Sequence, residues 1–228
     1  MDAEIHGAHT EPDIDYVLVD FEPLHKQRWR TNTLRLVCAE FPPYTTCKWH
    51  QHLKYGIYVV MAPLDVIEQP YGQQPRPLVQ EKGAVFCRDH TKDKLIHIAT
   101  TRELPAFLIE IELLKEKADI IPNGQLPLHA GAGIELLADE PECRVYRITL
   151  HVKDHASPAL SLNLPTEAVL LALDDCEAQV TTTINDEEIT YSVSLKIGGD
   201  VHMSPGACTV KVVSASVEKM HFVLAEVY

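Results

Sequence analysis

Residues 107–114 read FLIEIELL, and the last eight residues of the chain, 221–228, read HFVLAEVY. Both have the alternation of a β-strand with one face in a core. Each of these two stretches is preceded, at a similar distance along the chain, by another related stretch. These are GAVFCRD at 83–89 and GDVHMSP at 199–205. Corresponding positions in the two halves are about 114 residues apart, so the sequence predicts an internal duplication of one β unit.

Alternation recurs throughout both halves, and sustained helical periodicity is almost absent. The predicted strands are 33–38, 55–61, 63–68, 83–88, 94–100 and 106–114, and then 143–152, 167–175, 178–184, 188–197, 209–216 and 221–228. Short strands with proline-rich turns are typical of sheets that avoid open edges by closing into barrels or double-sheet rolls. We therefore expect an all-β fold of two duplicated jelly-roll barrels.

The longest stretch without a strand pattern is 115–135, which is rich in glycine and proline and is predicted to be a linker. We expect a first domain at 1–118 and a second at 119–228. Each half has a size at which a domain can bury its own core.

Charge and composition limit the partners. The formal charge of -13 disfavours nucleic acid and anionic membrane surfaces. No signal peptide or membrane span is predicted, so we expect a cytoplasmic protein. Six cysteines without a CxxC pair indicate reduced, buried thiols.

Several motifs are similar to the two-part signature of the cupin superfamily. They are HQH at 50–52, a glycine that opens a strand (Gly83), a later lone histidine (His97) and, in the second half, GGDVHMSPG at 198–206, which is similar to the Gly-x5-Pro opening of the second cupin motif. Since these motifs span both halves, the whole chain resembles a bicupin, with a double-stranded β-helix barrel in each half.

The resemblance implies a metal site in the first barrel formed by His50, His52 and His97. Side chains two apart on a strand share a face, so His50 and His52 can enter one barrel together. Imidazoles suit a divalent transition metal, with Fe²⁺ first and Zn, Ni, Cu or Mn as alternatives. Tyr58 has the same strand parity and is the predicted catalytic residue that orients substrate or oxygen.

Two departures from the cupin pattern affect this site. The glutamate expected four or five residues after the second histidine is replaced by Gly56 and Ile57. The insertion HTKDK at 90–94 precedes His97, and His90 within it is an alternative ligand. A three-histidine set without an acid is similar to thiol and diketone-cleaving dioxygenases among cupins.

Four further residues are candidates near the site. Arg35 or Arg88 could bind a substrate carboxylate, but strand parity does not decide which one points inward. Cys47 and Cys87 are candidate neighbours of the site, with a buried inert thiol as the default role of each.

The second half lacks a comparable set of donors. The repeat places SLN at 161–163 opposite HQH, and Val210 or Lys211 opposite His97, while Glu167 falls where the missing glutamate would be. We therefore expect a degenerate, metal-free second barrel that serves as a packing partner or dimer surface.

Two hypotheses of function follow. The first is a metal-dependent cupin enzyme, either a three-histidine non-haem iron dioxygenase or a related isomerase or lyase, acting on a small polar organic acid. The second is a non-catalytic bicupin with a decayed metal site that binds a small ligand or forms a structural homodimer. Retention of three histidines favours the first, and loss of the glutamate favours the second.

Overall fold

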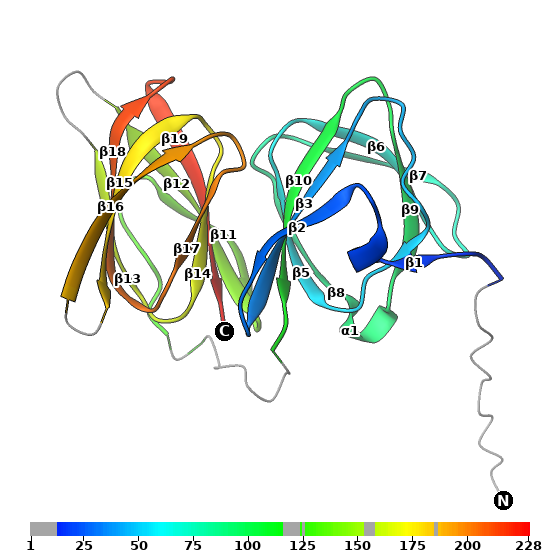
Figure 1. Cartoon of the computed structure of the whole chain (residues 1–228), viewed down its shortest axis with the longest axis horizontal. Coiled ribbons are helices and arrows are strands. Elements are labelled where there is room, and N and C mark those ends of the chain that lie inside the picture. The colour runs from blue at the N-terminus through cyan, green and yellow to red at the C-terminus, as the bar shows by residue number, and fades with distance from the viewer. Residues whose placement is uncertain (1–12, 116–123, 125, 153–157, 185–186) are drawn as a thin grey trace, which may run out of the picture.

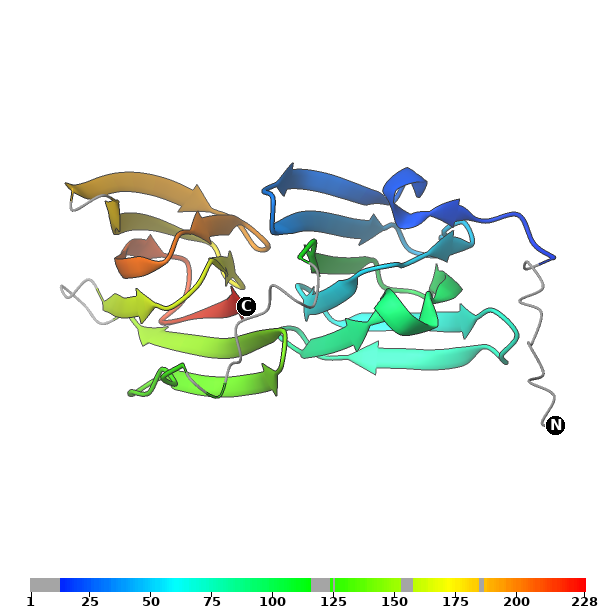
Figure 2. The ribbon, with the colours of Figure 1, turned by 90° about the horizontal axis from the view of Figure 1, so that it is seen from below.

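The computed structural model describes residues 13–115, 124, 126–152, 158–184 and 187–228. These residues are built almost wholly of strands, which form two barrels lying side by side (Figure 1). Seen from below, the barrels follow one another along the long axis of the molecule (Figure 2).

The first barrel consists of two five-stranded sheets. One sheet contains, in order, β1 (Val17–Leu18), β4 (His50–Gln51), β9 (Ile96–Thr101), β6 (Leu64–Pro70) and β7 (Arg76–Gln80). The other contains β2 (His25–Arg30), β3 (Leu34–Phe41), β10 (Ala106–Leu113), β5 (Tyr55–Val60) and β8 (Val85–Asp89). A 3-10 turn η1 (Val19–Phe21) and a one-turn helix α1 (His90–Asp93) complete this barrel.

The second barrel repeats this plan. One sheet contains β11 (Ile134–Glu140), β12 (Cys143–His151), β19 (Lys219–Val227), β14 (Ala168–Ala172) and β17 (Asp200–Met203). The other contains β13 (Ala159–Leu164), β18 (Gly206–Ala215), β15 (Cys176–Ile184) and β16 (Glu187–Leu195).

The strand orders of the two barrels correspond one to one, apart from the additional β1. The sheet β2-β3-β10-β5-β8 has the same order as β11-β12-β19-β14-β17, and β4-β9-β6-β7 has the same order as β13-β18-β15-β16. This correspondence confirms the predicted all-β fold. The predicted domain boundary at 118/119 lies outside the described residues and stays a prediction.

A second hydrophobic core lies between the barrels. In β10 the side chains of Ile109 and Ile111 leave the barrel interior and join a cluster that also contains Val145, Val223 and Ala225 of the second barrel. All five side chains are buried. Both faces of β10 and β19 are therefore covered.

Polar contacts add to the apolar contact between the barrels. The Trp29 indole N–H donates to the Asp200 carboxylate (2.5 Å), and Lys82 pairs with Asp174 (2.9 Å). The first barrel therefore rests on the second through one sheet, and its other sheet and its interior remain available for a site.

Some strands lie outside the ranges predicted from the sequence. β7 lies between the predicted strands 63–68 and 83–88 and includes Pro77. It is the last strand of its sheet, and an edge strand tolerates a proline because one side of its backbone needs no partner. No helix among the described residues is long and apolar enough to cross a membrane.

Candidate metal centre

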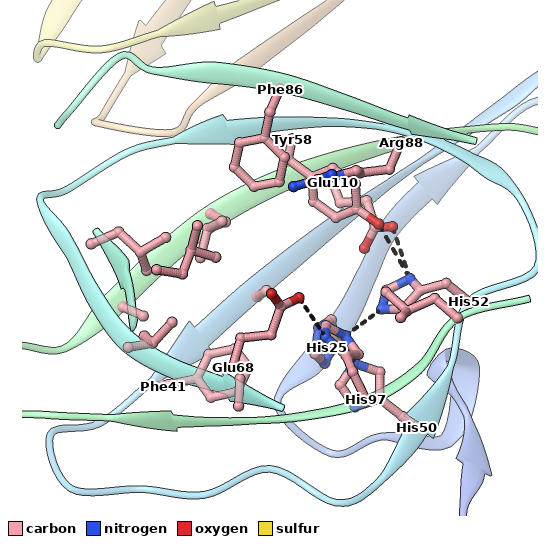
Figure 3. A pocket seen from close by; sticks show the side chains of 18 of the residues that line it. His25, Phe41, His50, His52, Tyr58, Glu68, Phe86, Arg88, His97 and Glu110 are labelled. Carbon is pink, nitrogen blue, oxygen red and sulfur yellow. Dashed lines mark hydrogen bonds and ion pairs between the residues drawn. The ribbon is translucent and has the colours of Figure 1, made fainter. Parts of the chain in front are cut away.

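His50, His52 and His97 meet inside the first barrel. Strand β4 pairs antiparallel with β9, and His50 lies directly opposite His97 in this pairing. His52 follows β4 and is fixed by a hydrogen bond from its backbone N–H to the carbonyl of Leu95 (2.9 Å). Their rings converge in Figure 3, with Nε2 of His97 3.0 Å from Nε2 of His50 and 3.1 Å from Nε2 of His52.

These separations suit ligands of one metal ion. Two nitrogens bound at right angles to an ion at about 2.1 Å lie roughly 3.0 Å apart. The separations of His97 from His50 and from His52 therefore suit a shared cation.

In two of these rings the outer nitrogen, Nδ1, which points away from the cluster, forms a hydrogen bond that fixes the tautomer. Nδ1 of His50 donates to the Lys48 carbonyl (2.9 Å), and Nδ1 of His97 donates to Glu68 (3.1 Å). The hydrogen bond with His97 lowers the pKa of Glu68 to about 2, so this carboxylate accepts the proton. A neutral imidazole that donates from Nδ1 presents a lone pair at Nε2.

Burial keeps these two rings neutral. It lowers the pKa of His50 to about 2 and also lowers the pKa of His97. Two inward lone pairs then face each other at 3.0 Å without a proton between them. A cation satisfies both, so the donor set fits a divalent metal.

His52 is oriented by a carboxylate that sequence reasoning missed. Its Nδ1 lies 3.2 Å from Oε1 of Glu110 on β10 and 3.4 Å from the Tyr58 hydroxyl (Figure 3). Burial opposes the charge of His52, but the Glu110 carboxylate outweighs burial and raises the pKa of His52. Among the described residues, neither oxygen of the buried Glu110 has a well-directed hydrogen-bond partner.

The absence of a glutamate after HQH has a steric reason. A Cβ on Gly56 would come within 2.8 Å of the Tyr58 ring, which occupies the space that a side chain at 56 would need. Gly56 pairs with Glu112 of β10, two residues from Glu110. Carboxylates reach this end of the barrel from the neighbouring strand β10, and Glu110 lies at the outer nitrogen of His52.

The two arginine candidates have different environments. Arg35 is buried and bonded to Glu112 and Asp20, so its charge is already neutralised. Arg88 lines the cavity with its guanidinium 5.7 Å from the centre of the Phe86 ring. Arg88 is an exposed residue, and it is the arginine of the two that contributes to the cavity lining.

The two cysteine candidates also separate. Cys47 is buried with its Sγ 3.7 Å from Nδ1 of His50, and burial raises the pKa of this thiol to about 11. Cys87 packs against the core between the barrels and lies 3.8 Å from the thiol of Cys143. Only Cys47 is a neighbour of the site.

His90 and Tyr58 both line the cavity. His90 begins α1, is 3% exposed and lies with its ring 5.4 Å from the ring of His52. The HTKDK insertion forms this one-turn helix, which carries His90 inward. Tyr58 stacks on Phe86 with ring centres 4.9 Å apart, so its position is fixed.

The cavity has a volume of about 90 Å³. One water needs roughly 10–15 Å³ on this measure, so the space suits a molecule of a few non-hydrogen atoms. Its polar end carries the histidines, and the remainder is lined by the apolar side chains of Ala39, Phe41, Leu64, Val66, Leu78, Phe86, Leu95, Ala99, Ala106 and Leu108.

Comparison with known proteins shows which solved structures have a similar fold. No known protein family and no curated protein matches the sequence. Among solved structures, AerE from Microcystis aeruginosa is similar with a TM-score of 0.60 and 10% identity, covering 91% of this chain and 99% of AerE. Oxalate decarboxylase from Lactobacillus farciminis, in a formate complex, has a TM-score of 0.59 and 9% identity over 86% of this chain and 77% of its own. A cupin 2 conserved barrel domain protein from Leptotrichia buccalis has a TM-score of 0.50 and 11% identity over 90% of this chain and 88% of its own.

The chain has the bicupin fold. This confirms the fold that the resemblance implied. The two barrels of the bicupin can also be compared with each other, because corresponding strands form their interiors.

Two arginine–glutamate pairs align the barrels of the bicupin. Glu112 on β10 faces Arg35 on β3, and Glu226 on β19 faces Arg144 on β12. These pairs occupy the same place in the two strand orders. With these pairs as the reference positions, each residue of the first barrel can be compared with its counterpart in the second.

The comparison separates site residues from structural ones. Two residues before the shared glutamate, the first barrel has Glu110 and the second has Leu224. Gly56 pairs with Arg88 in the first barrel, and Ala168 pairs with Met203 at the corresponding place in the second. The polar residues around the first cavity are thus replaced by apolar residues in the second.

The predicted alignment of SLN at 161–163 with HQH is wrong by one residue. In β13, Ser161 and Asn163 are exposed, whereas the leucines beside them point inward. Val210 is buried and the adjacent Lys211 is exposed, so Lys211 does not enter this barrel. Glu167 instead bonds His202 at 2.6 Å. The described interior is aliphatic, and a leucine-rich strand gives no periodicity signal that fixes such an alignment.

Proposed function

We propose that this bicupin is a metal-dependent enzyme whose first barrel binds a divalent transition metal through His50, His52 and His97. The observation that carries the proposal is the convergence of their Nε2 atoms at 3.0 and 3.1 Å. The outer nitrogens of all three rings face oxygen atoms, which is the arrangement of metal-ligating histidines.

The proposed substrate is a small organic acid. The cavity combines a histidine cluster, the cationic Arg88 and an apolar remainder. A metal with neutral ligands keeps its full positive charge, and this favours an anionic or chelating molecule. The oxalate decarboxylase with a similar fold acts, by its name, on a small dicarboxylate, which agrees with this substrate class.

Iron(II) is the proposed ion and dioxygenation the proposed reaction, with a related isomerase or lyase reaction as the second candidate. When bound, the ion would polarise a chelated substrate and supply redox chemistry. The protein's own residues bind and orient the substrate and the ligands: Arg88 holds a carboxylate, Tyr58 positions a polar substrate group, and Glu110 orients the ring of His52. The apolar walls exclude water.

Replacing Arg88 with methionine, its counterpart in the second barrel, should weaken binding of small carboxylates by about 10-fold or more. Hydrogen bonds to charged groups contribute roughly 1.5–3 kcal/mol, and the variant loses them. The measurement is a titration of the cobalt(II)-loaded protein with oxalate, malonate, pyruvate and formate, followed by its visible spectrum. Arg102→Met, which removes an exposed arginine paired with Asp65, is the matched control and should leave these affinities unchanged.

Three outcomes would overturn the proposed function. They are failure of the untagged protein to hold or take up any transition metal, failure of all four carboxylates to perturb the cobalt spectrum, and equal affinities in Arg88→Met and wild type. Metal-free protein would favour the non-catalytic bicupin. With iron(II)-loaded protein, oxygen uptake that depends on a carboxylate supports dioxygenation, and turnover without oxygen supports the lyase or isomerase reaction.

A further inference from the structure

A fourth histidine, His25, faces the same cluster. It begins β2, and its ring centre lies 4.7 Å from that of His50 and 6.1 Å from that of His52. One ring nitrogen of each of these three histidines lies within 4.8 Å of the other two. Figure 3 shows His25 within the histidine cluster at the polar end of the cavity.

The outer nitrogen of His25 has its own buried carboxylate. Nδ1 lies 2.8 Å from Oε2 of Glu22, which is 2% exposed. Glu22 also accepts the backbone N–H groups of Leu24 (2.7 Å) and Lys48 (3.2 Å), so it is held in place. A carboxylate that already accepts two backbone donors accepts from Nδ1 as well, which leaves Nε2 of His25 as the lone-pair nitrogen.

His25 therefore repeats the construction of His97. Each ring donates from Nδ1 to a partly or wholly buried glutamate, Glu22 for one and Glu68 for the other. Histidines that bind metals are oriented in this way by a carboxylate or carbonyl. Among the described residues, no hydrogen bond occupies Nε2 of His25.

The second barrel again supplies a contrast. His25 pairs with Ala39 on β3, and the corresponding pair in the second barrel is Ile134 with Ile148 on β12. The imidazole at position 25 thus belongs to the barrel that has the histidine cluster, and an isoleucine takes its place in the aliphatic barrel.

We propose that His25 is a fourth nitrogen ligand, so that the ion is held by four imidazoles and no carboxylate. This inference rests on the proposed function only in requiring that the first barrel bind a metal. Two nitrogens on opposite sides of one ion are roughly 4.2 Å apart, which is compatible with the spacing of His25, His50 and His52.

A four-imidazole set has consequences for metal and substrate. It favours iron, nickel, copper or zinc over magnesium, calcium or manganese, which prefer oxygen ligands. It also leaves two positions of a six-coordinate ion, enough for a substrate that binds through two oxygen atoms.

His25→Phe tests the assignment, because phenylalanine keeps a ring against Phe41 and removes both nitrogens. We expect the affinity for zinc, measured by competition with a chelator, to fall by at least about 10-fold, the lower limit reported for loss of a second-shell partner alone. X-ray absorption should show one imidazole fewer in the zinc complex than in wild type. His129→Phe removes a histidine that also faces a buried glutamate, Glu226, but lies in the second barrel, and it should change neither result.

His25→Ala provides a second variant if phenylalanine disturbs the barrel, with circular dichroism as the check on folding. Wild-type zinc affinity and an unchanged imidazole count in the folded His25 variants would overturn the four-imidazole site and leave a three-histidine site. A wild-type protein that binds no metal would instead overturn the proposed function.

Discussion

Replacing His50 and His52 together with alanine is expected to abolish stoichiometric metal binding. Both rings are buried, and their inner nitrogens face the position that a shared ion would take. Loss of a partner that only orients a ligand already costs roughly 10–100-fold in affinity, so loss of two ligands should cost more than about 100-fold. Elemental analysis of untagged protein should change from about one ion per chain to none.

A matched control removes two histidines from the second barrel. His202 and His221 pair with Glu167 and Asp174 and lie outside the cluster, so His202→Ala with His221→Ala should retain the metal. Equal metal content in both double variants and in wild type would contradict the assigned site. Loss of metal from the control alone would place the ion in the second barrel.

Replacing Glu110 with leucine is expected to lower metal affinity by about 10–100-fold while the protein stays folded. The carboxylate lies 3.2 Å from Nδ1 of His52 and orients that ring. Burial opposes the charge of Glu110, but His52 beside it holds its pKa below the ordinary value. Removing an orienting carboxylate has this magnitude of effect at metal sites. The measurement is a zinc titration against a competing chelator, together with a thermal unfolding curve.

The leucine should be tolerated because Leu224 occupies the corresponding position in the second barrel, where it is fully buried. Glu110→Gln gives a variant closer in shape, and Glu40→Gln makes the same chemical change at an exposed position. Unchanged zinc affinity in both Glu110 variants would show that the carboxylate has no part in the site.

The sequence was sufficient to predict the two site residues that lie close together in the chain. His50 and His52 lie two apart, and strand geometry alone puts them on one face. The repeat and the motifs gave the two barrels, and the resemblance gave His97. Its pairing with His50 across β4 and β9 depends on a register that sequence alone does not fix.

Residues contributed by distant strands were missed. Glu110 arrives from β10, more than fifty positions after His52, and His25 arrives from β2. A signal for Glu110 was present, since a carboxylate stands within the apolar run of 107–114 where the repeat has a leucine. His25 follows FEPL in a segment where no strand was predicted, so nothing in its neighbourhood pointed inward.

Crystals of the metal-loaded protein, with anomalous diffraction recorded at the edge of the bound element, test the central claim most directly. The account predicts one peak per chain inside the first barrel, roughly 2.0–2.3 Å from Nε2 of His50, His52 and His97. A peak at another position, or rings that turn away from a metal-sized gap in crystals soaked with iron, zinc or nickel, would contradict it.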